Sequence, residues 1–82
     1  MRQYEDNGIA RAIKEMDEAF ANYNACRADG RNAHAEMWEL ELVGMARVFS
    51  YLTGYTVNRG NNRVEIVSKS GMTITRKWVK EV

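Results

Sequence analysis

The stretch VFSYLTGYTVNRGNNRVEIV, residues 48–67, contains the point at which the hydrophobic period changes. Before Gly54, apolar side chains recur every three or four residues, which is the period of a helix face. After Gly54 they alternate with polar side chains, as Val64 and Ile66 show, which is the period of a strand with one buried face. Glycine suits this junction because it adopts the left-handed conformation that ends many helices. The junction therefore separates a helical half from a sheet half.

Upstream of the junction, the period predicts a helix over residues 33–53, with Asn32 as its N-cap and Gly54 as the residue after its end. Its apolar side chains form two stripes. The first stripe contains Trp38, Leu42, Met45, Phe49 and Leu52, widened by Ala35 and Ala46. The second is centred on Gly44 and contains Met37, Leu40, Val48 and Tyr51. A helix that is apolar over more than half of its circumference needs two packing partners.

The partner of the second stripe stays open between the sheet of the same chain and a second copy of the chain. Gly44 costs a helix interior about 1 kcal/mol relative to Ala, and so small a residue favours the close approach of another backbone. A chain of 82 residues has one small core, and its single Cys26 forms no internal disulfide. We therefore expect a homodimer whose self-association seam consists of Met37, Leu40, Gly44, Val48 and Tyr51.

The first helix is predicted over residues 8–28. Asp6 or Asn7 could cap its N-terminus, and Gly30 follows its end. Its apolar residues follow spacings of three and four, so they form one narrow buried face. They are Ile9, Ile13, Met16, Phe20 and Tyr23.

Three strands are predicted over residues 55–59, 63–69 and 72–80. A two-residue first turn at Gly60-Asn61 or at Asn61-Asn62 keeps the same faces, so both remain open. A three-residue second loop, residues 69–71, would pair Ile66 with Ile74 and place Arg63 opposite Lys77. The predicted core face contains Tyr55, Val57, Val64, Ile66, Met72, Ile74 and Trp78.

These elements predict a single α+β domain over residues 1–82. An antiparallel helix pair packs on a three-stranded antiparallel meander, in the order helix, helix, strand, strand, strand.

The net charge of +1 is a cancellation between two unlike halves. Residues 1–53 carry six basic and nine acidic side chains, whereas residues 54–82 carry six basic and two acidic ones. On the predicted sheet, the basic residues could contact an acidic protein surface or phosphates. The alternative is a solvated face whose lysines oppose edge aggregation. The candidate partner-binding residues are Arg59, Arg63, Lys69, Lys77 and Lys80.

No pattern in the chain indicates catalysis, a metal site or a cofactor. His34, Glu36 and Glu39 begin the second predicted helix, but their spacing does not bring the histidine onto one face with either carboxylate. Zinc deaminases combine such an H-x-E pattern with P-C-x-x-C, and this chain has no Pro and one Cys. Cys26 would need a neighbouring base to act as a nucleophile. We therefore expect a non-enzymatic protein.

The longest stretch without a charge, residues 48–58, is only 11 residues long, so no transmembrane helix is expected. Glu5 and Asp6 lie where a signal peptide needs an apolar run, which favours a cytoplasmic location. Single-domain chains of this kind are common among accessory proteins of phages and plasmids, and no family resemblance is identified.

The first functional hypothesis is a regulatory or inhibitory protein-interaction module that uses the basic sheet residues and the apolar helix seam. The alternative is a nucleic-acid-binding protein that uses the basic sheet. The predicted outer face has no aromatic side chain to stack on bases, which disfavours recognition of single strands. A two-stranded ribbon in a DNA groove remains open.

Overall fold

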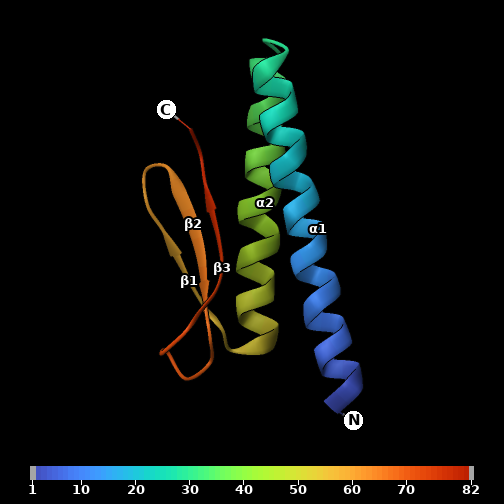
Figure 1. Cartoon of the computed structure of the whole chain (residues 1–82), viewed down its shortest axis with the longest axis vertical. Coiled ribbons are helices and arrows are strands. Elements are labelled where there is room, and N and C mark those ends of the chain that lie inside the picture. Colours follow the sequence, from blue (N-terminus) through green and yellow to red (C-terminus); the bar gives the residue numbers. More distant parts are fainter. Residues whose placement is uncertain (1, 82) are drawn as a thin grey trace.

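The computed structural model describes residues 2–81, with side chains from Gly8 onward. It confirms the predicted order of two helices followed by a three-stranded antiparallel sheet (Figure 1). The two helices run side by side, and the sheet lies along one side of the pair. The elements are α1 (Arg2–Ala28), α2 (Asn32–Thr53), β1 (Thr56–Arg59), β2 (Arg63–Val67) and β3 (Ile74–Val79).

The ends of the helices agree only in part with the predicted caps. Helix α1 already begins at Arg2 and continues through residues 6 and 7, so neither is its N-cap. Arg2, Gln3 and Glu5 are good helix formers, which favours the longer helix. Helix α2 includes Asn32, and its N-cap position is Arg31, without a side-chain cap.

Both glycines predicted to follow the helices are confirmed. Gly30 and Gly54 have φ angles of +76° and +80°, in the left-handed region that L side chains rarely adopt. The Gly54 N–H donates to the carbonyl of Ser50 at 2.9 Å, which satisfies one of the last carbonyls of α2.

The first hairpin has the Asn61-Asn62 turn, the second of the two predicted alternatives. The Gly60 N–H donates to the Arg63 carbonyl at 2.9 Å, and Val57 pairs with Ile66. Because both turns preserve the faces, the predicted inward positions of this hairpin are confirmed: Val64 and Ile66 are buried and Val57 is half-buried.

The register of the second hairpin differs from the prediction. Ile66 pairs with Arg76 rather than with Ile74, and a bulge between Ile66 and Val67 shifts the pairing by one residue. The connection is also longer, because the Ser68 N–H donates to the Thr73 carbonyl at 2.7 Å. A bulge inserts an unpaired residue, so alternation counted along the sequence loses its phase there.

Three core-face assignments depended on that register. Trp78 is buried at 4% exposure, as predicted, and it pairs with Val64. Met72 and Ile74 were assigned to the core wrongly, because their exposures are 87% and 54%. The predicted opposition of Arg63 and Lys77 is also wrong, since Arg63 pairs with Val79.

The core lies between the helix pair and the inner face of the sheet. Helix α1 contributes Met16 and Ala19, and the sheet contributes Val64, Ile66 and Trp78. Helix α2 contributes residues from a single side of its circumference, which are Leu42, Ala46 and Phe49. One side of α2 thus packs against both α1 and the sheet.

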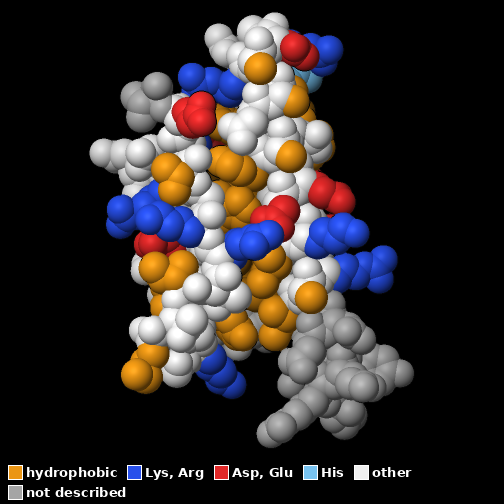
Figure 2. Space-filling model, in the orientation of Figure 1, with side chains coloured by type: hydrophobic (Ala, Val, Ile, Leu, Met, Phe, Trp, Pro, Cys, Tyr) orange, Lys and Arg blue, Asp and Glu red, His pale blue; other side chains and the backbone are white. Residues whose placement is uncertain are grey.

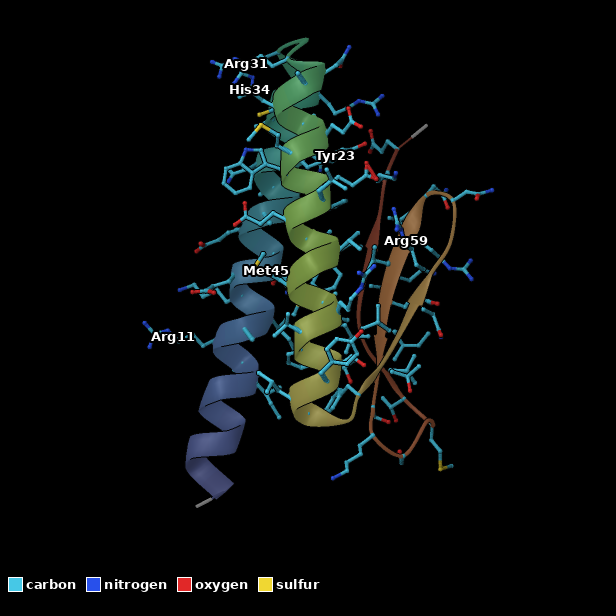
Figure 3. The ribbon with its side chains drawn as sticks, turned by 180° about the vertical axis from the view of Figure 1, so that it is seen from behind. Arg11, Tyr23, Arg31, His34, Met45 and Arg59 are labelled. Atoms are coloured by element: carbon cyan, nitrogen blue, oxygen red, sulfur yellow. The ribbon has the colours of Figure 1, made fainter. Side chains whose placement is uncertain are left out.

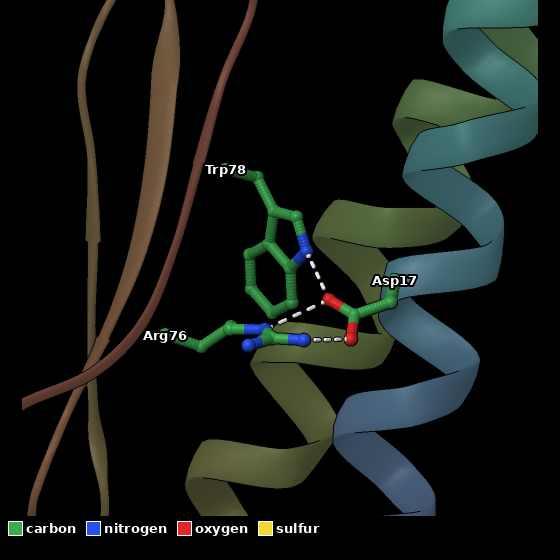
Figure 4. A network of polar contacts seen from close by, with 3 residues as sticks. All are labelled: Asp17, Arg76 and Trp78. Atoms are coloured by element: carbon green, nitrogen blue, oxygen red, sulfur yellow. Dashed lines mark hydrogen bonds and ion pairs between the residues drawn. The ribbon is translucent and has the colours of Figure 1, made fainter.

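A polar contact joins α1 to the last strand (Figure 4). Asp17 accepts hydrogen bonds from the Arg76 Nε at 2.9 Å and from the Trp78 Nε1 at 2.8 Å, and a second guanidinium nitrogen of Arg76 bonds its other oxygen. The hydrogen bond from Arg76 is the main reason that the pKa of Asp17 is lowered; Trp78 adds to the effect and partial burial opposes it. Lys80 and Glu39 form a second link, with 2.7 Å between Nζ and Oε2.

Candidate interaction surface

The second apolar stripe of α2 is exposed. Met37, Leu40, Val48 and Tyr51 have exposures of 66%, 62%, 55% and 77%. They lie on the side of α2 opposite its buried residues, because successive residues are turned by about 100° around a helix. Viewed from behind, α2 stands in front of α1 with the sheet beside it (Figure 3). We call these four residues together with Gly44 the α2 seam.

The sheet of the same chain therefore does not cover the α2 seam. This excludes the first of the two alternatives that the sequence left open for the second stripe. Gly44 is also exposed, and a Cβ built on it would have no heavy atom within 4 Å outside its own helix backbone. Within the described part of the chain, no second backbone comes close to this glycine.

A groove adjoins the α2 seam, where the first half of α1 diverges from the second half of α2 (Figure 1). Its volume is about 1090 Å³, and its apolar lining includes Ile9, Met45 and Phe49. Figure 3 shows Met45 between the two helices. Val48 lines the groove and also belongs to the α2 seam, so the two features form one continuous surface.

Leu52 shows how the divergence of the helices creates this groove. The helical period placed Leu52 in the buried stripe, but it is 82% exposed and lines the groove. The helical period of a sequence indicates which side of a helix is apolar, but it does not indicate where the neighbouring helix diverges from it. No pattern in the sequence therefore predicts the groove.

Figure 2 shows hydrophobic side chains along the hollow that runs down the middle of one face of the molecule. Charged residues are few in the groove: Glu15 and Glu41 come from the helices, and Lys69 comes from the segment after β2. The aliphatic part of Lys69 lies beside Gly54, with its Cε 3.4 Å from the position that a Cβ would take there.

The basic residues of the sheet half do not share one face. Arg63 and Lys77 lie on the outer face of the sheet, but Glu65 lies between them. Glu65 pairs across the strands with Lys77, and its Oε1 is 3.4 Å from the Nε of Arg63. An acidic side chain thus offsets the two positive charges on this face.

The other three predicted partner-binding residues lie elsewhere. Arg59 pairs with Val64, so it belongs to the inner side of the edge strand β1. Lys80 is bound to Glu39 of α2, and Lys69 lies at the groove. The structure therefore distributes Arg59, Lys69 and Lys80 over three places, and their role in binding stays a prediction.

The residues considered for metal binding or catalysis do not form a common site in the structure. His34 and Glu36 are exposed on α2, Glu39 is engaged with Lys80, and Cys26 is a half-buried free thiol. Among the side chains that the structure describes, residues 8–81, no group of three or more His, Cys, Asp or Glu is arranged to hold a metal ion. Nor does either described helix have the length and apolar character needed to cross a bilayer.

No family model matches the chain, and no match is found among curated proteins or among solved structures. Function is therefore inferred from the surfaces of this molecule. Five of the eight large hydrophobic side chains exposed in the described residues belong to the α2 seam or its adjoining groove: Met37, Leu40, Val48, Tyr51 and Leu52.

Proposed function

We propose that this chain is a non-enzymatic protein-interaction module, regulatory or inhibitory in role, that works as a homodimer through the α2 seam. The observation that carries the proposal is the exposure of Met37, Leu40, Val48 and Tyr51 on one side of a single helix. Burying such a side chain fully stabilises an assembly by about 1.5–3 kcal/mol. Contiguous exposed apolar surface of this kind marks interaction sites.

The charges favour a protein as the partner over a nucleic acid. Phosphate contacts need several cations on one surface, whereas Glu65 lies between Arg63 and Lys77 on the outer sheet face. The exposed cations Arg59 and Lys69 are available to an acidic patch on a second protein. A reducing compartment suits the free thiol of Cys26, so the proposal places the homodimer in the cytoplasm.

Light scattering at high micromolar concentration tests the proposal, with a dimer mass expected for the wild-type chain. Leu40→Glu and Tyr51→Glu each put a charge into the α2 seam, so both variants should be monomeric. Met72→Glu is the matched control, because Met72 lies outside α2 and is an apolar residue even more exposed than Leu40 and Tyr51. It should remain dimeric.

A wild-type monomer would overturn the proposed homodimer. Equal dissociation of the Met72→Glu variant would show that the dimer does not form through the α2 seam. Retardation of a nucleic-acid probe at low salt, lost as salt rises, would favour the nucleic-acid alternative.

A further inference from the structure

The groove between α1 and α2 has an apolar lining that the chain itself leaves in contact with water. Met16 and Phe49 in this lining are buried, and Ile9 and Met45 are half-buried. Leu52 also lines the groove and is 82% exposed. The groove is therefore open to water along one side, and it covers one side of an occupant rather than its whole circumference.

An amphipathic helix matches a groove of this kind. Such a helix has an apolar side that needs cover and a polar side that stays in water. A long acyl chain is apolar on every side, so an open groove would leave part of it in water. Along α2, the groove extends from Glu41 to the end of the helix at Gly54, 13 residues further on. At 1.5 Å per residue this distance is about 20 Å, the length of a helix of about four turns.

The charged residues of the groove are separated along its length. Lys69 lies beside Gly54, at the C-terminal end of α2, and Glu41 lies about 20 Å away along the helix. Glu15 of α1 lies level with Met45 of α2, since the helices are antiparallel and each residue is 13 positions from the end of its helix at the connecting loop. Glu15 is thus nearer to Glu41 than to Lys69, so the groove has an acidic end and a basic end.

These charges are available to a partner. Glu15, Glu41 and Lys69 are exposed, and none of them takes part in an ion pair among the side chains of residues 8–81. Arg11, four residues before Glu15, points away from α2 (Figure 3). Complementary charges around a binding groove select the partner and fix its direction.

We propose that the groove binds an amphipathic helix of a second protein. The end of that helix next to Glu15 and Glu41 carries basic side chains, and the end next to Lys69 carries acidic ones. The proposal rests on the protein-interaction function proposed above, whose partner it specifies, and it does not depend on the homodimer.

The partner helix and a second copy on the α2 seam approach α2 from different directions. At 100° per residue, Leu52 and Met45 lie about 80° and 100° around the helix from Gly44, which is the centre of the seam. The two directions are therefore about a quarter turn apart. At the usual interaxial distance of about 8–10 Å, the axes of the two bound helices would be about 13 Å apart, so both fit without overlap.

Two synthetic peptides of about 14 residues test the proposal. Both have leucines at helical spacing on one side and a hydrocarbon staple on the other, because helices this short are marginal alone. The first peptide has two glutamates in its first turn and two lysines in its last turn, and the second has these charges exchanged. A nitroxide at the N-terminus of each peptide broadens the NMR signals of the protein residues near it.

Both peptides should bind the wild-type chain, in opposite directions. The nitroxide should broaden the amide signals of Tyr55 and Lys69 with the first peptide, and that of Glu41 with the second. The same pattern of broadening with both peptides would overturn the proposal, and so would the absence of binding by both. Saturable binding of dodecanoate by a chain that binds neither peptide would replace the helix with a lipid as the occupant.

Charge reversal tests the acidic end. Glu15→Lys combined with Glu41→Lys leaves the basic end of either peptide without a partner, so the dissociation constants should rise about tenfold. Glu18→Lys combined with Glu36→Lys is the matched control, because these residues are exposed on the same two helices but do not line the groove. The control should leave both constants unchanged. Equal effects of the two pairs would overturn the assigned end.

Two adjacent positions of α2 separate this proposal from the homodimer. Leu52→Glu puts a charge into the groove, so peptide affinity should fall at least about tenfold while light scattering still shows a dimer. Tyr51→Glu should give a monomer that still binds both peptides. Circular dichroism checks that each variant is folded.

Unchanged peptide binding by the Leu52→Glu variant would overturn the helix site and leave the homodimer standing. A monomeric wild-type chain that binds both peptides would overturn the homodimer alone.

Discussion

Asp17 is a polar side chain of α1 that links the helix pair to β3. Its carboxylate accepts hydrogen bonds from both Arg76 and Trp78, residues from a strand far along the sequence. Arg76 stands at a position of β3 whose side chain points inward, where the alternation of the strand would favour an apolar residue. Asp17 explains why a charged residue is accommodated there, and no local pattern in the sequence predicts this partnership.

Asp17→Asn should lower the free energy of unfolding by about 1 kcal/mol, at the lower end for charged hydrogen bonds because the carboxylate keeps some contact with water. The folded-state pKa of Asp17 is depressed, so its contribution is present above the unfolded-state pKa of about 3.9 and is lost as the pH falls through the folded value. Wild-type stability should therefore fall more steeply below about pH 4 than that of the variant.

Chemical denaturation at several pH values checks this, with Glu18→Gln on the neighbouring exposed position as the control. Parallel pH profiles for the wild type and Asp17→Asn would show that the contact contributes nothing.

Two glycines should respond with opposite signs to the same substitution. Gly44 is helical with open space around it, so Gly44→Ala should stabilise the isolated protomer by about 0.5–1 kcal/mol. Gly54 has a φ of +80°, and Gly54→Ala should destabilise it by about 1 kcal/mol. Thermal unfolding at dilution measures both. Equal signs would contradict the assigned helix end at Gly54.

The two hairpins show why one register could be predicted and the other could not. In the first, either two-residue turn keeps Val57, Val64 and Ile66 on one face, so alternation alone sufficed. In the second, the bulge after Ile66 and the longer loop shift the pairing of β2 with β3. No residue type in this stretch indicates the size of that shift. Trp78 was still assigned correctly, because its large apolar ring has most to gain from burial.

Truncating two isoleucines separates the observed register from the one predicted. Ile66 is fully buried at 0% exposure, so Ile66→Ala should cost about 2–5 kcal/mol. Ile74 is 54% exposed, and Ile74→Ala should cost less than about 1 kcal/mol. Urea denaturation gives both values. A comparable loss at the two positions would instead support pairing of Ile66 with Ile74.

The α2 seam was predictable from the sequence because it depends only on the helical period. Each of its residues lies on the side where the period placed it, and the exposures show that the chain itself leaves that side uncovered. The adjoining groove was not predictable, because Leu52 and Ile9 line it only where α1 diverges from α2. Contacts between distant elements, rather than the pattern within one element, decide that shape.

In the whole molecule, α2 is the helix that packs against both α1 and the sheet and still has an exposed apolar side. The fold measures 43 × 23 × 16 Å, with a single core between the helix pair and the sheet. A chain this small has too few elements to cover α2 on all sides. The exposed side therefore follows from size and topology, and a second copy would provide the missing layer.

The contact of Asp17 with β3 spans 59 residues to Arg76 and 61 to Trp78. During synthesis, both helices are made before any strand, so the sides that later face the sheet are at first uncovered. Asp17 finds its partners only when β3, the last of the five elements, has been made. The growing chain therefore exposes apolar side chains that the finished fold buries, such as Leu42 and Phe49 of α2. A delay in synthesis between α2 and β3 would lengthen that exposure without altering the folded protein.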